Sequence, residues 1–334
     1  MIEIERERAK TVAADAFSVH GITPSDAAIV ADVLVSADAR GKHSHGLIRL
    51  PRYIRGIKHD NVDPEGRIER KHDTAAVVTL CGGSRLGPVV ASEAVGELVS
   101  RTDQYGIGAV GVHNSTHLGM LGYYTDIIRR EGYVGIAVTN TEPAMPPYGG
   151  SEPILGTNPI AIGLPTDPPF NLDMSTSAIA RGSIEAAAER GELLPEGVAL
   201  DAEGNPTRDP DAALDGAILP FGGPKGSGLA IAIEVLAGGV VGASMGREVT
   251  GTYHTADQCT KGDLFMAIDP QALGGPKAVD RIESFLQRLT NTAPAGDHES
   301  VRLPSRTAVR GEHAETVTVE PALWDQVVEI AGHR

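Results

Sequence analysis

The chain of 334 residues predicts an α/β protein in which helices from both chain ends flank one central sheet domain. Two observations support this prediction. Between residues 75 and 139, short apolar runs of strand type alternate with amphipathic helical segments, an order typical of α/β domains. The two ends of the chain instead carry apolar residues at helical spacing.

Helices are expected at the N-terminal end. Residues 4–19 form an amphipathic segment. A second helix is expected after Thr23, whose hydroxyl suits an N-cap, with Pro24 at the first helical position. A third, short helix is expected to start near Gly46. At the other end of the chain, residues 324–331 predict a closing helix.

The central part of the chain supplies the strands. The run at residues 75–81 is continuously apolar, as in strands that are buried on both faces. Other short apolar runs follow, separated by helical patterns and glycine-containing turns. The expected strands span residues 75–81, 107–112, 133–139, 159–164, 170–174 and 264–268, and the expected helices span residues 88–103, 120–131, 178–190, 227–242 and 281–289.

Composition and charge exclude several classes of protein. With 44 acidic and 29 basic residues the net charge is −15, which disfavours a nucleic-acid partner. Two cysteines exclude a disulfide framework and a four-cysteine zinc site. The first residues are charged, and no apolar run is long enough to cross a bilayer. We therefore expect no signal peptide, no membrane span and a cytoplasmic protein.

Two glycine-rich segments differ in their meaning. Residues 106–111 match the dinucleotide fingerprint Gly-x-Gly-x-x-Gly, but that motif needs a strand before it and a helix within it. Here a helix precedes the motif, so we expect no Rossmann site. Residues 221–228 precede an apolar helix and contain Lys225, which are the properties of a phosphate site. A glycine-rich turn with an exposed lysine is the alternative.

Two histidine-containing segments are candidates for proton chemistry. The first contains His45 and Arg49, which face one side of a helix if Gly46 opens one. A histidine exchanges protons near neutral pH, and an arginine grips a carboxylate through two hydrogen bonds. The second contains His117 and follows an expected strand, a frequent place for catalytic groups.

The same histidines also suggest a metal-dependent lyase or hydrolase, which would use His43, His45, His113 and His117. No nearby aspartate or cysteine completes a ligand set around His113 and His117, and the residues between them do not favour a helix. We therefore expect no metal site.

Several stretches follow one another in a specific order along the chain: Ser44-His45-Gly46 with Arg49, and residues 114–119, 146–150, 156–159, 172–175, 200–210, 222–228 and 302–304. In this order they resemble the second type of the malate/L-lactate dehydrogenase family, which includes malate, sulfolactate and ureidoglycolate dehydrogenases. The resemblance implies NAD(P)-dependent interconversion of a 2-hydroxy acid and a 2-oxo acid by a homodimer. It also implies a mixed-sheet, non-Rossmann nucleotide-binding domain over residues 73–291, and a helical domain formed by residues 1–72 and 292–334.

The resemblance also implies roles for single residues. The proton carrier is the residue that matches either His45 or His117. The implied substrate contacts are Ser44, Arg49 and Asn158, and the implied nucleotide contacts are Thr141, Asp173, Met174, Ser175, Pro224, Lys225, Ser305, Arg306 and Thr307.

Two departures from the family pattern leave the substrate and the cofactor open. His43 stands where many members have aspartate, which resembles the ureidoglycolate dehydrogenases. Ser305-Arg306 stands where members often have glycine, and an arginine there could favour the 2′-phosphate of NADP over NAD. The alternatives to a malate- or lactate-type enzyme are a ureidoglycolate or sulfolactate dehydrogenase, a metal-dependent lyase or hydrolase, and a nucleotide-binding module without catalysis.

Overall fold

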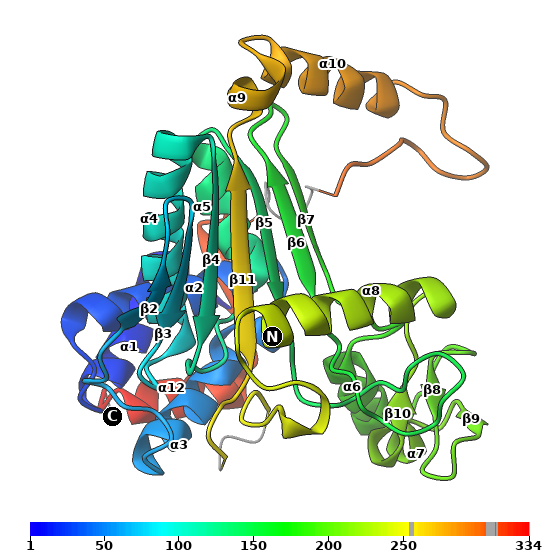
Figure 1. Ribbon diagram of the computed structural model, residues 1–334. Helices are drawn as coiled ribbons and strands as arrows, with labels where there is room; N and C mark the ends of the chain where they lie inside the picture. Colours follow the sequence, from blue (N-terminus) through cyan, green and yellow to red (C-terminus); the bar gives the residue numbers. More distant parts are fainter. Residues whose placement is uncertain (254–256, 305–310, 312, 334) are drawn as a thin grey trace.

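A seven-stranded mixed sheet forms the centre of the computed structural model, which describes residues 1–253, 257–304, 311 and 313–333 (Figure 1). The predicted α/β fold with a mixed sheet is therefore confirmed. Among the described residues, no helix is long and apolar enough to cross a membrane. In order across the sheet, the strands are β2 (Glu69–Asp73), β3 (Val77–Cys81), β4 (Ile107–His113), β11 (Gly262–Ile268), β5 (Val134–Thr139), β6 (Ile160–Leu164) and β7 (Phe170–Met174).

Strand β11 lies between β4 and β5, although it comes more than 100 residues later in the chain. It is antiparallel to both neighbours, with Phe265 opposite Val110 and Ala137. The start of β11 therefore lies beside the last residues of β4 and β5. This arrangement brings the residues before β11 next to the loops that follow those two strands.

Helices cover both faces of the sheet. Helices α4 (Gly87–Tyr105) and α5 (Leu121–Arg130) pack against one face of the sheet. Ala137 and Phe265 lie on that face. On the other face, Val138 and Leu264 pack against Ile233 of α8 (Pro224–Glu234), as their alternation along each strand requires (Figure 1). The helix α8 continues into a wider π-type turn at Val235–Val240. Gly106 ends α4 and β4 follows at once, so the Gly106–Gly111 spacing belongs to a helix end and a strand, as expected.

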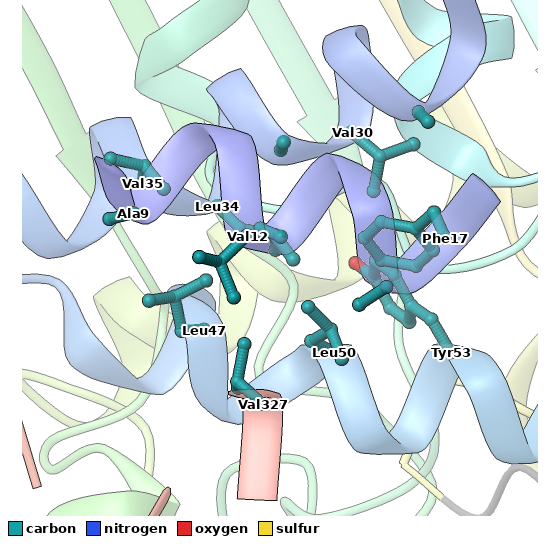
Figure 2. Close-up of a cluster of buried hydrophobic side chains, with 14 of the residues drawn as sticks. Ala9, Val12, Phe17, Val30, Leu34, Val35, Leu47, Leu50, Tyr53 and Val327 are labelled. Carbon is teal, nitrogen blue, oxygen red and sulfur yellow. The ribbon is translucent and has the colours of Figure 1, made fainter. Parts of the chain in front are cut away.

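The two chain ends pack together. Strand β1 (Ile2–Glu5) pairs with β12 (Thr316–Val319). The sequence analysis expected a helix from residue 4, but the isoleucines of β1 alternate along the chain and fit the two-stranded pairing instead. Figure 2 shows Val12, Phe17, Leu34, Leu50 and Val327 in one buried cluster. The helices that supply this cluster are α1 (Arg6–Ser18), α2 (Pro24–Ala39), α3 (Leu50–Lys58) and α12 (Pro321–Ile330). The domain boundaries given above stay a prediction.

Two further units lie at the edges of the sheet. A three-stranded sheet packs with α6 (Arg181–Arg190) beside one end of α8 (Figure 1). At the opposite end of the sheet, helices α9 (Pro270–Gly274) and α10 (Ala278–Thr290) project from the rest of the chain (Figure 1). The remaining elements are β8 (Ala199–Leu200), β9 (Pro206–Thr207), β10 (Ala217–Ile218) and α7 (Pro210–Asp215).

Candidate active site

A cavity of about 320 Å³ lies at the end of the sheet where strands β4, β5 and β7 finish and β11 begins. Most of the site residues expected from the sequence line it, although they come from four distant parts of the chain. The expected residues in its wall are Ser44, His45, Arg49, His117, Thr141, Asp173, Met174 and Ser175. Ser305, Arg306 and Thr307 lie outside the described residues.

A buried carboxylate shapes the segment that carries His45. The side chain of Asp38, at the end of α2, accepts hydrogen bonds from Nδ1 of His43 at 2.9 Å and from the backbone N–H of Leu47 at 2.7 Å. A Cβ on Gly46 would lie 2.1 Å from Oδ1 of Asp38, so this close approach requires glycine. The bond to Asp38 raises the pKa of His43, which therefore has a structural partner outside the cavity.

The segment folds as two short 3₁₀ turns, His43–His45 and Leu47–Arg49, and not as the α-helix expected from Gly46. Gly46 is extended between the two turns because the chain wraps around Asp38. His45 and Arg49 nevertheless face the same cavity, as the sequence predicted.

His45 stands at the cavity wall with Ser44 as its partner. Nδ1 of His45 lies 2.9 Å from Oγ of Ser44. Burial, followed by the charges of Arg49 and Lys42, lowers the pKa of His45 to about 3. The ring is therefore neutral near pH 7 in the free protein.

His117 follows β4 and lies beside His45, with 5.5 Å between the ring centroids. Its Nδ1 accepts a hydrogen bond of 3.1 Å from the backbone N–H of Gly119 and lies 2.9 Å from Oη of Tyr53. Burial, and then the charge of Arg49, holds the pKa of His117 well below its usual value. The site therefore contains two neutral imidazoles side by side.

Arg49 offers a guanidinium to the cavity. Its Nε donates to the carbonyl oxygen of Ser44 at 2.8 Å, and its Nη1 lies 3.4 Å from the carbonyl oxygen of Thr252. Within the described part of the chain, Arg49 forms no ion pair with a carboxylate. Burial lowers its pKa, although the group stays charged. This arrangement suits a bound carboxylate.

Several residues in or beside the cavity were not anticipated from the sequence: Arg181, Tyr253 and Lys261 line it, and Arg52 and Tyr53 lie next to it. Lys261 precedes β11 and forms a buried ion pair with Asp263, with Nζ 2.6 Å from each carboxylate oxygen. The guanidinium carbons of Arg52 and Arg181 lie 4.6 and 4.8 Å from the ring centroid of Tyr253. Of these residues, only Tyr53 could have been predicted near the site, because it follows Arg49 by four residues in a segment expected to be helical.

Asn158 lies behind the cavity wall, and its expected contact with the substrate stays a prediction. The side chain is fully buried, and its Oδ1 accepts from the backbone N–H of Thr141 at 3.1 Å. Its Nδ2 donates to the carbonyl oxygen of Ala230 at 3.0 Å and to Oε2 of the buried Glu234 at 2.6 Å. The amide is thus engaged within the protein, and it holds the loop that carries Thr141 against α8.

The start of α8 has features of a phosphate site, although Pro224 and Lys225 are exposed outside the cavity wall. No side chain caps the helix N-terminus, and Gly223 has a φ of 61°, which favours glycine. The backbone N–H of Phe221 donates to the carbonyl oxygen of Thr176 at 3.0 Å, which holds this turn beside Ser175. Gly226 and Ser227 donate their N–H groups to the carbonyl oxygens of Phe221 and Gly223, and Pro224 has no N–H. The start of α8 therefore presents the side chain and the backbone N–H of Lys225, next to the hydroxyl of Ser175, and this set fits the phosphate of a dinucleotide.

Metal ligands are not clustered in this region. In the ranges that the structure describes, no group of three or more His, Cys, Asp or Glu side chains is placed to hold a metal ion.

The chain with this mixed sheet and cavity belongs to the malate/L-lactate dehydrogenase family, whose model matches residues 4–328. The resemblance drawn from the motifs is therefore confirmed. The chain is 42% identical over 308 residues to the L-sulfolactate dehydrogenase of Methanothermobacter thermautotrophicus, with 91% of this chain and 89% of that protein covered.

Two other similar proteins extend the comparison. The chain is 34% identical over 339 residues to the (2R)-3-sulfolactate dehydrogenase (NADP(+)) of Chromohalobacter salexigens, with 99% and 98% covered. The solved structure of sulfolactate dehydrogenase from Methanocaldococcus jannaschii superposes with a TM-score of 0.94 at 39% identity, with 99% of this chain and 97% of that chain covered. The fold and the family thus agree.

Proposed function

We propose that the protein is an NAD(P)-dependent dehydrogenase that interconverts a 2-hydroxy acid and a 2-oxo acid. The observation that carries the proposal is the guanidinium of Arg49, which has no described carboxylate partner and shares a cavity with His45 and His117. A 2-oxo acid offers a carboxylate for the arginine and a neighbouring carbonyl oxygen for a histidine. The family and the names of the relatives support the same reaction class.

In this proposal the substrate is oriented before it reacts. Arg49 binds the C1 carboxylate, which fixes the position of C2 in the cavity. A histidine donates a hydrogen bond to the C2 oxygen and stabilises the negative charge that develops there. When bound, the nicotinamide supplies the hydride that reduces C2 or accepts the hydride that leaves it.

The cofactor is proposed to extend from the cavity to the start of α8. Thr141, Asp173, Met174 and Ser175 would contact the nucleotide within the cavity, while Lys225 would bind phosphate through its side chain and its backbone N–H. Pro224 at the start of the helix and residues 305–307 remain proposed contacts. Either NAD or NADP is compatible with this arrangement, and one relative is named for NADP(+).

For the substrate, we favour an acid with a second negative group, as in malate or sulfolactate. The cavity wall contains the cations Lys42 and Arg181 in addition to Arg49, while the charge of Lys261 is paired with Asp263. Relatives are named for these two acids. A ureidoglycolate-type substrate is the alternative within the family. The homodimer and the cytoplasmic location stay proposals, the former supported by exposed apolar side chains on α8, including Ile231.

The test is the loss of absorbance of NADH or NADPH with oxaloacetate, sulfopyruvate and pyruvate, and its gain with ureidoglycolate and each oxidised cofactor. We expect turnover with at least one acid, and faster turnover with the dianionic acids than with pyruvate. Cofactor binding without turnover on any acid would refute the dehydrogenase proposal. Turnover that requires an added divalent metal and no nicotinamide would favour the lyase or hydrolase.

A further inference from the structure

We infer that the two cavity histidines have different tasks: His117 is a neutral hydrogen-bond donor to the C2 oxygen, and His45 carries the proton that this oxygen gains or loses. This inference rests on the proposed function. The evidence is the hydrogen-bond partner of each ring, because the partner decides which ring nitrogen can hold a proton.

The partners of His117 fix its proton on Nε2. The backbone N–H of Gly119 donates to Nδ1 at 3.1 Å. A backbone N–H can only donate, so Nδ1 must present its lone pair, and the neutral ring then carries its hydrogen on Nε2. A proton on Nδ1 would face the hydrogen of Gly119, and this buried N–H would lose its acceptor. His117 can therefore offer a hydrogen bond through Nε2 but resists becoming an imidazolium.

Tyr53 is a positioning residue for the same ring. Its one O–H is shared between two acceptors of His117, the ring Nδ1 at 2.9 Å and the carbonyl oxygen at 3.0 Å, which fits a ring with no hydrogen on Nδ1. Tyr53 is 3% exposed, and burial raises the pKa of its hydroxyl, so it does not ionise near neutral pH. The tyrosine and Gly119 thus occupy the Nδ1 side of the ring and leave Nε2 for a ligand.

His45 has a partner that tolerates both of its protonation states. Its Nδ1 lies 2.9 Å from the hydroxyl of Ser44, and a hydroxyl can either donate or accept. The hydrogen bond therefore persists whether or not Nδ1 carries a proton. Ser44 is also exposed, so a proton that leaves His45 can be replaced from solvent. His45 can change its charge without losing a partner, whereas His117 cannot.

Charge around the rings limits them to one proton. With the centroids 5.5 Å apart, two imidazolium ions would repel each other. In the free protein, burial and then the charges of Arg49 and Lys42 keep His45 neutral by lowering its pKa. A substrate carboxylate on Arg49 offsets part of that charge, so His45 takes up its proton as the oxo acid binds. The titratable and charged groups facing His45 from its own segment and from the rest of the cavity wall are Lys42, Arg49, His117, Glu142, Asp173, Arg181 and Lys261.

Reduction of the oxo acid combines a hydride transfer to C2 with a proton transfer to the C2 oxygen. A reduced nicotinamide provides a hydride, with two electrons, to C2. The C2–H bond forms and the carbonyl π pair moves to the oxygen, which accepts a hydrogen bond from Nε2–H of His117. The Nε2–H bond of protonated His45 breaks and its proton passes to that oxygen. Neutral His45 remains, with its other proton on Nδ1 against Ser44.

Long-range ¹H–¹⁵N spectra of the full-length protein, labelled on histidine, test the role of His117 without turnover. The signals of the His117 ring are assigned as those that disappear in His117→Gln. We expect this ring to remain neutral, with hydrogen on Nε2, from about pH 5 to 8, with and without bound cofactor. A His117 ring that carries hydrogen on Nδ1, or that titrates in this range, would overturn the inference.

Glutamine variants test how the two histidines divide the reaction, because glutamine keeps an N–H donor but cannot carry a proton. We expect His117→Gln to retain at least about tenfold more turnover than His117→Ala. His45→Gln and His45→Ala should lose turnover equally, by about 10²–10⁴-fold, and His45→Ala should regain part of it with added imidazole. An active His45→Gln enzyme would overturn the inference, as would His117→Gln and His117→Ala enzymes that are equally impaired.

These outcomes are separable from failure of the proposed function. A wild-type protein that binds the dinucleotide but reduces no oxo acid refutes the proposed reaction. The spectra still determine the tautomer of His117 in that case. Cofactor titration of each variant shows whether the site has kept its shape.

Discussion

Replacement of Arg49 by lysine tests the substrate end of the proposed site. The hydrogen bond from Nε to the carbonyl oxygen of Ser44, at 2.8 Å, orients the guanidinium. The Nη groups are then placed to grip a carboxylate through two parallel hydrogen bonds. Lysine keeps the positive charge, but it offers a point donor and loses the bond to Ser44.

The expected loss corresponds to one charge-assisted hydrogen bond with the substrate. Such a bond contributes about 1.5–3 kcal/mol, and about 1.4 kcal/mol is a factor of ten in affinity. We therefore expect Arg49→Lys to raise the KM for the oxo acid by about 10- to 100-fold. The affinity for the dinucleotide should stay unchanged, because Arg49 is proposed to bind only the acid.

The assay is the initial rate of nicotinamide absorbance change, with the oxo acid varied at saturating cofactor. Arg52→Lys is the matched control, because Arg52 lies one turn further on, keeps its charge, and packs on the ring of Tyr253 at 4.6 Å. Its KM should stay within about threefold of wild type. An Arg49→Lys enzyme whose KM also stays within about threefold would refute the carboxylate grip.

Three further changes examine the remaining parts of the site. Lys225→Met should raise the dinucleotide KM by about 3- to 10-fold, because it removes a charge from the start of α8; an equal rise in the oxo-acid KM would contradict a phosphate role. Asn158→Asp places a second carboxylate where Nδ2 lies 2.6 Å from Glu234, so the free energy of unfolding in urea should fall by about 3–5 kcal/mol. The matched control Asn291→Asp, at an exposed position, should change the free energy of unfolding by less than about 0.5 kcal/mol. Similar losses in Asn158→Asp and Asn291→Asp would contradict the expected cost of a second buried carboxylate. The pKa of His45 is about 3 in the folded protein and about 6.5 when unfolded, so protons bind the unfolded state more tightly between these values. The free energy of unfolding of the wild-type protein should therefore fall as pH drops below about 6.5, and that of His45→Gln should fall less over the same range. Parallel curves for the two proteins would contradict this prediction.

The inner part of the fold could be predicted because its strands are apolar and local in sequence. The runs that became β3, β4, β5 and β11 stand out from their flanking turns. Strand β2 could not be recognised, because it is an edge strand whose five residues, Glu69–Asp73, are exposed and polar. Strand β1 was missed for another reason, since four residues next to a helix gain their partner only from β12 at the far end of the chain.

The order of the strands was harder to predict than their existence. Alternating strands and helices favour β4 and β5 as neighbours, but β11 pairs with both of them. Antiparallel insertion of a strand from a distant part of the chain leaves no local signal. For the same reason, no motif pointed to Lys261, which reaches the cavity because it precedes β11.

Asn158 shows the limit of motif reading at the site itself. A motif places a residue near the ligand, but the spacing does not distinguish a side chain that touches the ligand from one that builds the loop. Here Glu234 of α8 accepts from both Asn140 and Asn158, and Asn158 in turn holds the backbone N–H of Thr141. One buried carboxylate therefore ties the loops after β5 and before β6 to the helix whose N-terminus is proposed to bind phosphate. Because these segments share Glu234, we expect a change at that residue to shift the loop that carries Thr141 without any contact to the substrate.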